Sequence, residues 1–312
     1  MAQVGMSGSF LAVTDLRAEV LWVRQIQQDV ALGPEALFRT LRRGFIEGLE
    51  ELGKAHTKVY GIGIGLPGDI EIATARTTAT SAMHDWADFP LTNRLEEAFG
   101  APAFVDRDVN LMAVGERSTS WPDADVFICL KVGTVIACGV VVGDQVIRGV
   151  GGLAGEVGHT KLQSNSLACA CGSVGCLNTV AGGAALAEQL QKMGHPAKTA
   201  RDVTILANSG IAEAGSAVRT AGTQVGEVMA LLVNVLNPAV ITVWGYLVDA
   251  GDQFLAGMEE SIYRYALPAS ARAVTITRVR LGDQAGLRGA ALAVIEKAFD
   301  ISSMDKLVAA QR

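Results

Sequence analysis

The stretch from Gly155 to Cys176 constrains this chain most, because it gathers three of the five cysteines and a histidine in one short segment. It reads GEVGHTKLQSNSLACACGSVGC, and its soft and borderline ligands have the composition of a closed, tetrahedral, structural zinc site. Gly172 and Gly175 permit the tight turns that bring three thiolates to one metal ion. The predicted ligands are His159, Cys169, Cys171 and Cys176.

Two other roles for these cysteines fit the sequence less well. Free cysteines pack as small apolar residues, whereas this segment is polar and rich in glycine. Disulfides belong to secreted chains, and the N-terminus shows no basic segment followed by an apolar stretch and a cleavage site. The remaining Cys129 and Cys138 lie in apolar, strand-like runs. We therefore expect a cytoplasmic protein, whose reducing surroundings keep thiolates available for zinc.

Length and composition narrow the class of protein. A chain of 312 residues exceeds one ordinary hydrophobic core, so two domains are expected. Half of the residues are apolar and 35 are glycine, which is typical of an α/β protein with many tight turns. The net charge of −6 argues against a surface that binds nucleic acid. No apolar run reaches the length of a membrane span, so no contact with a membrane is expected.

Hydrophobic periodicity predicts a mixed α/β chain. The apolar runs 126–132 and 136–142 predict a hairpin. The segment 106–110 follows a strand at its C-terminal end, where α/β folds usually keep polar residues. No internal repeat at a fixed period is visible. Further predicted strands are 9–14, 18–23, 58–66, 103–105, 146–148, 240–243 and 274–279, and helices are expected from Pro34 onward and at 91–99, 111–118, 184–193, 212–236, 253–265 and 285–299.

Several motifs give nearly the whole chain a resemblance to a known family, the ROK group of sugar kinases and sugar-responsive repressors. The cysteine motif with the preceding GEVGH is the most specific of these motifs. The others are IGIGLPG at 62–68, His84-Asp85-Trp86 ahead of Pro90-Leu91, D-x-D-V-N at 106–110, LNPAVITVWG at 236–245 and LGDQAGLRGAALAVI at 281–295.

The resemblance implies the two-lobed, actin-like (ribonuclease H-like) ATPase fold, in which two lobes close over sugar and ATP. The implied N-terminal lobe comprises residues 1–113 and 286–312, because the family's C-terminal helix returns to it. The larger lobe, residues 114–285, carries the zinc motif and a dimerisation surface. The resemblance also implies that the Cys/His set binds a structural zinc.

On the sugar side, the resemblance implies a half-retained pocket. Asp108 matches the base that takes a proton from the attacking hydroxyl in a kinase, although an aspartate before a helix also serves as a cap. Arg107 replaces the family's usual Asn, which makes a neutral sugar a worse fit and brings an anionic ligand into consideration. Asn178 replaces a Glu that holds sugar hydroxyls. The implied sugar-binding residues are Gly68, Arg107, Asp108, Glu156, His159 and Asn178, and Asn110 is also retained.

On the nucleotide side, the sequence departs from the family at three places. The family opens with D-x-G-G-T, whose aspartate organises Mg²⁺, but Gly5 stands at this position. In the second phosphate loop, β-branched Val135 replaces a glycine and disfavours positive φ. In the adenosine-side cluster, Trp244 and Tyr246 stand where small residues are expected. The sequence thus predicts that ATP and Mg²⁺ do not bind at the degraded site formed by Gly133, Thr134 and Gly245.

This contrast predicts a carbohydrate-sensing protein, similar to the effector-binding domain of NagC/XylR-type transcriptional regulators. The alternative is a ROK sugar kinase that phosphorylates a hexose or amino sugar with ATP, and a purely structural dimer module is a third reading. Such regulators contact DNA through a helix-turn-helix domain, which we expect to be absent from this chain. The expected partners are a small-molecule sugar or sugar derivative and a second copy of the chain in a homodimer.

Overall fold

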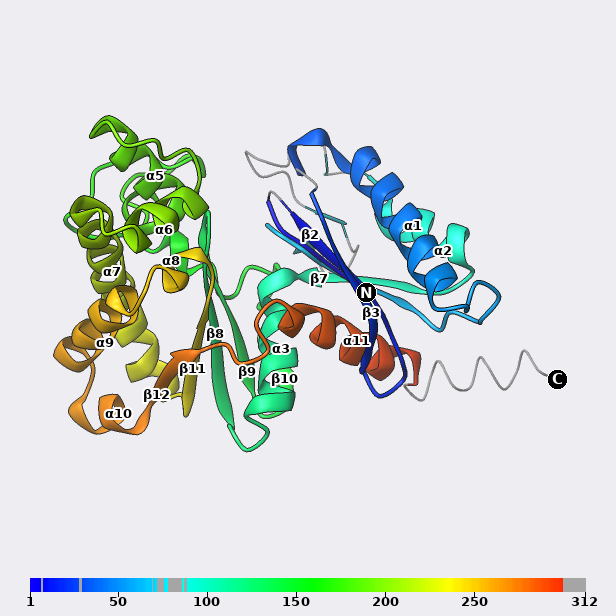
Figure 1. Ribbon diagram of the computed structural model, residues 1–312. Helices are drawn as coiled ribbons and strands as arrows, with labels where there is room; N and C mark the ends of the chain where they lie inside the picture. Colours follow the sequence, from blue (N-terminus) through cyan, green and yellow to red (C-terminus); the bar gives the residue numbers. More distant parts are fainter. Residues whose placement is uncertain are drawn as a thin grey trace. The chain divides into compact units, whose positions relative to one another are not determined.

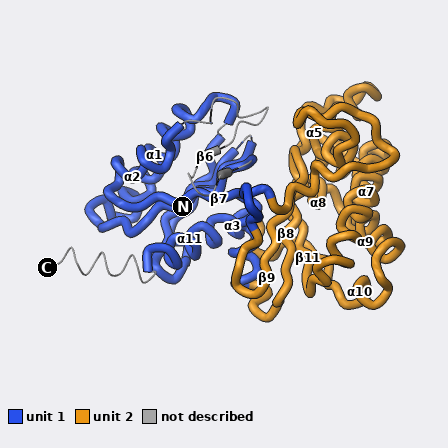
Figure 2. Tube along the Cα trace, turned by 180° about the vertical axis from the view of Figure 1, so that it is seen from behind, with its two compact units in different colours: residues 1–119, 148–153, 283–312 blue, residues 120–147, 154–282 orange. Residues whose placement is uncertain are grey.

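The computed structural model describes residues 1–6, 8–27, 30–68, 70–71, 76–77, 86 and 89–299. Two compact units divide the chain (Figure 2). Unit 1 contains residues 1–119, 148–153 and 283 onward, and unit 2 contains residues 120–147 and 154–282. A division at residue 113 would cut helix α3 (Asp108–Ser120), whereas the units divide near the end of that helix. His84 and Asp85 of the sequence motif lie outside the described residues.

Unit 1 is a five-stranded sheet with helices packed on it (Figure 1). Its strands are β1 (Ala2–Val4), β2 (Ser9–Thr14), β3 (Val20–Ile26), β4 (Ile62–Leu66) and β7 (Ala103–Arg107), and its longer helices are α1 (Pro34–Glu51), α2 (Leu91–Phe99), α3 and α11 (Gln284–Ala298). The strand order is β3-β2-β1-β4-β7. β2 pairs antiparallel with β1 and β3, whereas β1, β4 and β7 are parallel neighbours.

The alternation of large residues and glycine along β4 sets the packing of unit 1. Ile62, Ile64 and Leu66 are buried in a core shared with α1 and α2. The intervening glycines face helices α11 and α3: a Cβ on Gly63 would lie 2.7 Å from the Ala290 carbonyl oxygen, and a Cβ on Gly65 would lie 3.1 Å from Asp108 Cα. Because successive strand residues point to opposite faces, the glycines let two helix backbones come close to β4.

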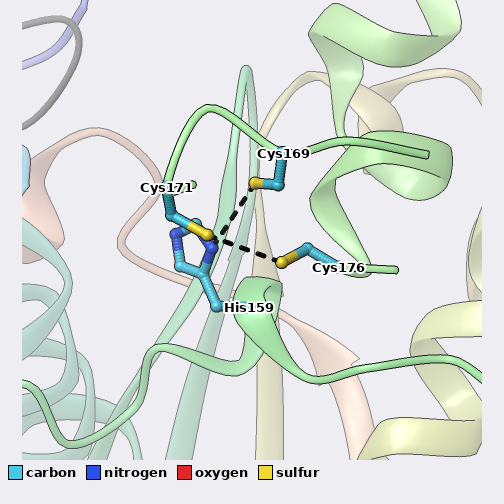
Figure 3. A group of neighbouring side chains, drawn as sticks. All are labelled: His159, Cys169, Cys171 and Cys176. Carbon is cyan, nitrogen blue, oxygen red and sulfur yellow. Dashed lines mark hydrogen bonds between the residues drawn. The ribbon is translucent and has the colours of Figure 1, made fainter. Parts of the chain in front are cut away.

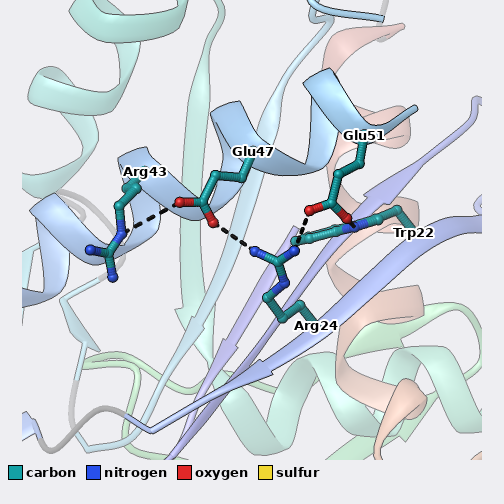
Figure 4. A network of polar contacts seen from close by, with 5 residues as sticks. All are labelled: Trp22, Arg24, Arg43, Glu47 and Glu51. Atoms are coloured by element: carbon teal, nitrogen blue, oxygen red, sulfur yellow. Dashed lines mark hydrogen bonds and ion pairs between the residues drawn. The ribbon is translucent and has the colours of Figure 1, made fainter. Parts of the chain in front are cut away.

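A polar network joins β3 to α1 on the outer side of unit 1 (Figure 4). Arg24 bonds to Glu47 at 2.6 Å and also to Glu51, while Trp22 Nε1 donates to Glu51 Oε2 at 2.7 Å. Arg43 extends the network along the helix, 3.8 Å from Glu47. The hydrogen bonds from Trp22 and Arg24 lower the pKa of Glu51. Since these groups are solvent-exposed, the network orients the edge strand more than it stabilises the unit.

Unit 2 repeats the strand arrangement of unit 1. Its strands are β8 (Val126–Val132), β9 (Ile136–Val142), β10 (Gln145–Val146), β11 (Val240–Trp244) and β12 (Thr275–Arg278), in the order β10-β9-β8-β11-β12. As in unit 1, the first three strands are antiparallel neighbours and the last pairings are parallel. Its helices are η3 (Val157–His159), α4 (Asn178–Ala181), α5 (Gly183–Lys192), α6 (Ala200–Asn208), α7 (Ala212–Leu236), α8 (Tyr246–Asp249), α9 (Gln253–Tyr265) and α10 (Pro268–Ala273).

The predicted elements and the observed ones agree best where periodicity is strong. The hairpin at 126–132 and 136–142 and the helices at 91–99, 212–236 and 253–265 are confirmed. The helix expected at 111–118 instead begins at Asp108, and the strand expected at 18–23 lies at 20–26. β1, α6 and α10 were not predicted. No helix in the described part of the chain has the length and hydropathy that a bilayer crossing requires.

We predict that Gly63→Ala destabilises unit 1 by about 1–3 kcal/mol, because the new methyl group meets backbone that cannot move aside. Gly215→Ala, in α7, is the control. The nearest atoms to its new Cβ belong to the end of the Gln253 side chain, at 3.2 Å, and alanine is favoured in helices by roughly 1 kcal/mol. Thermal and urea unfolding measure both variants, and equal stability of the two would contradict the packing described for β4.

Candidate functional site

The cysteines and histidine predicted as metal ligands come together in unit 2 (Figure 3). His159 ends the 3-10 helix η3, Cys169 and Cys171 lie in the following loop, and Cys176 lies two residues before α4. Their candidate ligand atoms all lie within 4.8 Å of one another. The loop thus brings together ligands that no single helix or strand carries.

Short backbone contacts shape the loop that carries the cysteines. The Cys169 amide donates to the Ser173 carbonyl at 2.7 Å, and the Gly172 amide donates to the Cys169 carbonyl at 3.0 Å. Gly172 and Gly175 have φ of 84° and 85°, a region that glycine adopts without strain. The loop thus turns back twice, as its glycines predict, and directs the three sulfur atoms to one point.

The ligand atoms have the spacing of a tetrahedral metal site. Cys171 Sγ and Cys176 Sγ are 3.7 Å apart, and Cys169 Sγ is 3.7 Å from His159 Nδ1. In a tetrahedron with metal–sulfur bonds of about 2.3 Å, two sulfur atoms lie roughly 3.8 Å apart. Four soft or borderline donors at this separation could hold Zn²⁺ with no open coordination position.

The surroundings of Cys169 and Cys171 change the pKa values of the two thiols differently. Burial raises the pKa of Cys169, and the neighbouring thiols of Cys171 and Cys176 add to this effect. A backbone hydrogen bond from Ser173 and the thiol of Cys169 lower the pKa of Cys171. The pKa values of these two neighbouring thiols are thus shifted in opposite directions.

The predicted sugar-binding residues of unit 2 are held against strand β9. The Cys138 amide donates to the Gly155 carbonyl at 2.8 Å, which fixes the segment ahead of Glu156. Glu156 Oε2 lies 3.8 Å from His159 Nε2, the ring nitrogen opposite the one that faces the sulfurs. The Asn178 amide oxygen accepts from the Ile136 amide at 2.7 Å. Asn178 thus links α4 to the β8–β9 hairpin.

The predicted sugar-binding residues of unit 1 lie at the C-terminal ends of β4 and β7. Gly68 follows β4 with φ of 92°. Arg107 ends β7 and Asp108 begins α3, and both side chains are buried. Asp108 Oδ1 accepts from the Val109 amide at 2.7 Å. The carboxylate therefore sits at the first turn of α3, where the helix dipole favours negative charge.

Asp106 accepts hydrogen bonds from two side chains, a role that was not predicted from the sequence. Its Oδ1 accepts from Asn110 Nδ2 at 2.8 Å, and its Oδ2 accepts from Arg148 Nε and Nη2 at 2.9 and 2.6 Å. These two hydrogen bonds to one carboxylate oxygen tie the segment 148–153 to the end of β7 within unit 1. Only the D-x-D-x-N pattern hinted at Asp106, and its partner Arg148 is too distant in sequence for any local pattern to indicate.

The predicted nucleotide-side residues of unit 2 also come together. A Cβ on Gly245, whose φ is 127°, would lie 2.5 Å from the Val132 carbonyl oxygen and 3.2 Å from the Gly133 amide nitrogen. The Gly183 and Ala184 amides donate to the carbonyl oxygens of Gly133 and Thr134 at 2.9 and 3.2 Å. Gly5 lies in unit 1, where it turns the chain between β1 and β2. The site residues thus form separate groups, each described within its own unit.

Comparison with known proteins places this arrangement in a family. A model described as ROK family matches residues 3–297. The chain belongs to the ROK family. A putative xylose repressor from a Caldicellulosiruptor species is 28% identical over 306 residues, which is 94% of this chain and 76% of the repressor. A glucokinase from Halalkalibacterium halodurans is 34% identical over 252 residues, which is 76% of each chain.

Solved ROK structures share the fold. A ROK hexokinase from Thermus thermophilus superposes with a TM-score of 0.76 at 29% identity, over 93% of this chain and 95% of the hexokinase. A ROK transcriptional regulator, a homologue of the E. coli MLC protein, gives a TM-score of 0.81 at 24% identity, over 95% of this chain and 77% of the regulator. The predicted actin-like ATPase fold is confirmed. Because ROK regulators and kinases share it, the fold does not separate them.

We predict that Cys176→Ala loses bound zinc and lowers the melting temperature, because three remaining donors no longer close the site. Cys129→Ala is the control: Cys129 is buried in strand β8, outside the cluster, so its loss creates a small cavity without removing a ligand. Metal analysis of both purified variants measures the difference. Acidification should also release the metal, because protons compete for thiolates. A full zinc content in Cys176→Ala would contradict this assignment.

Proposed function

We propose that this chain is a carbohydrate-sensing ROK protein that does not transfer phosphoryl groups, similar to the effector-binding domain of NagC/XylR-type regulators. The observation that carries the proposal is the closed turn at Gly5. The family resemblance puts the Mg²⁺-organising aspartate at this position, and the geometry of the turn leaves no space for a side chain.

The turn between β1 and β2 is closed by its own backbone. The Gly5 amide donates to the Gly8 carbonyl oxygen at 2.8 Å. A Cβ on Gly5 would lie 2.7 Å from the same oxygen, a contact that requires the backbone to move. A side chain at position 5 would therefore require a turn of a different shape, and the family's carboxylate does not fit this one. Among the described residues of this turn, Gly5, Met6 and Gly8, none supplies a carboxylate for the cation that neutralises a transferring phosphoryl group.

The second hairpin supports the same conclusion. In nucleotide-binding loops, free backbone amides and a helix N-terminus cradle phosphate. Here the first amides of α5 donate to the carbonyls of Gly133 and Thr134, so these donors are used within the protein. Val135, which replaces a glycine of the family's loop, is 46% exposed at the tip of the hairpin.

The residues that the family resemblance implies for sugar binding are better retained than those that it implies for nucleotide binding. Glu156 and His159 are held by η3 against β9, and the Cys/His set fixes the loop around them. We propose that this set binds zinc. Bound by His159 and the three cysteines, the ion would supply a cross-link that holds His159 in place, and it would activate no water. In unit 1, we propose Asp108 and Arg107 as ligand-binding residues, because a carboxylate and a guanidinium suit a hydroxylated or anionic ligand.

A ROK sugar kinase is the second candidate, because the glucokinase from Halalkalibacterium halodurans is 34% identical to this chain. Asp108 is present at the position of the family's base. This reading requires ATP and Mg²⁺ to bind without the aspartate of the first phosphate loop.

We predict that one or more members of a panel of pentoses, hexoses, amino sugars and their phosphates raise the melting temperature of the protein, and that ATP with Mg²⁺ does not. A ligand that binds only the folded state at about 100 times its Kd stabilises it by roughly 2.7 kcal/mol. ADP release, measured in a coupled assay with the same panel, should not exceed that of Asp108→Asn.

The matched controls for this experiment lie in unit 2. Glu156→Gln should abolish the sugar-induced shift, whereas Glu188→Gln, an exposed change in α5 where Glu188 pairs with Lys192, should keep it. Sugar-dependent ADP release that disappears in Asp108→Asn would establish the kinase instead. A protein stabilised by neither sugar nor nucleotide would overturn sensing altogether.

We further propose that the chain forms a homodimer through an apolar surface of unit 2. The surface consists of side chains that are 53% to 68% exposed, namely Leu231, Val235, Tyr263, Tyr265 and Leu267. The Leu267 amide donates to Asn234 Oδ1 at 2.7 Å, which brings the start of α10 onto the last turns of α7. Exposed clusters of tyrosine and aliphatic residues are typical of the centres of protein interfaces.

We predict that Leu231→Glu converts the dimer to monomer, because it places an unpaired charge in an apolar interface. Ile205→Glu is the control, since Ile205 is 54% exposed on α6 and is not part of the surface. Sedimentation velocity over a concentration series measures the mass of each variant. A monomeric wild-type protein, or an unchanged dimer in Leu231→Glu, would contradict this surface.

A further inference from the structure

Lys161 lies directly beside the metal-binding cysteines. It forms an isolated antiparallel bridge with Cys176, flanked by hydrogen bonds from the Leu162 amide to the Gly175 carbonyl and from the Leu177 amide to the Thr160 carbonyl, both of 2.9 Å. With this pattern the two bridged residues form a non-hydrogen-bonded pair, in which side chains on the same face are closest. Lys161 Nζ accordingly donates to Cys176 Sγ at 2.9 Å.

The two partners have very different exposure. Cys176 is completely buried, whereas Lys161 is exposed. The aliphatic stem of a lysine can lie along the protein while its ammonium reaches a polar group. A thiolate at the position of Cys176 has lost its water and needs a compensating donor, because a buried charge without a partner is costly. Lys161 supplies such a donor from the solvent side of the loop.

The charge of the cluster shows what this donor does. A divalent metal bound by three thiolates and a neutral imidazole carries one net negative charge. The ammonium group of Lys161 neutralises it.

We propose that Lys161 is the charge-compensating partner of the metal centre, and that its hydrogen bond to Cys176 raises the affinity of the site for zinc and slows the loss of the ion. The inference rests on the proposed zinc site. Asn165 complements Lys161 by holding the backbone of the same cysteine, since its Nδ2 donates to the Cys176 carbonyl at 2.9 Å. One residue thus positions Cys176, and the other compensates its charge.

We predict that Lys161→Met weakens zinc binding about 10- to 100-fold, the usual effect of removing an outer-sphere partner of a metal ligand. Competition with a chromophoric zinc chelator measures the affinity of the zinc-loaded protein. Lys161→Arg should stay close to wild type, because it keeps a charged donor. Lys192→Met removes the same charge from α5, where Lys192 pairs with Glu188, and should leave the affinity unchanged.

Cobalt substitution gives a readout that a merely structural role would not move. In Co²⁺-loaded Lys161→Met, the thiolate-to-cobalt charge-transfer band should shift to lower energy, because the sulfur electrons lose a stabilising hydrogen bond, and Lys161→Arg should restore it. Equal affinity and an unshifted band in a metal-loaded Lys161→Met would overturn the role of Lys161 alone. A wild-type protein that folds and binds no metal would overturn the zinc site itself.

Discussion

Close approach of backbone segments, permitted by glycine, positions the polar residues in both units. In unit 1, Gly65 brings β4 against the first residue of α3, so the Asp108 carboxylate emerges at a defined point. In unit 2, Gly155 and Gly158 bring the segment around Glu156 and His159 against β9, where any Cβ would meet the backbone of that strand. The segments that carry the site residues of this protein are therefore held in place by main-chain contacts.

The proposed sugar side and the proposed nucleotide side depend on different structural features. The sugar-side loop of unit 2 is built around donors that a metal can cross-link, which gives it rigidity without a hydrophobic core of its own. Binding of a nucleotide phosphate instead requires backbone amides that have no internal acceptor, and open space in front of the turn. At Gly183 the amide instead donates to the Gly133 carbonyl within the protein. The proposed loss of phosphoryl transfer would thus be compatible with the proposed sensing within one fold.

Sequence reasoning succeeded where the signal is local and failed where the structure depends on distant partners. The Cys/His set, the hairpin at 126–132 and 136–142, and helix α7 follow from spacing and periodicity, because their determinants lie within a few residues. Asp106 and Arg148 could not be paired from sequence, since no pattern links a strand end to a loop so far along the chain. Helix α6 was not predicted, although Thr199 and Asp202 form a capping box at its start. The repeated strand order of the two units was not predicted, because two sheets can share a strand order without sharing a repeated pattern of residues.

The return of α11 to the sheet of unit 1 has a consequence for biosynthesis. Strand β4 presents glycines to α11, which is translated after the whole of unit 2, so unit 1 lacks one covering layer until then. Unit 2 has all its strands and helices between residues 120 and 282, and it can complete its core earlier. Domains normally mature in order from the N-terminus. Because unit 1 is completed by a segment that follows unit 2, this chain order favours completion of the unit 2 core first.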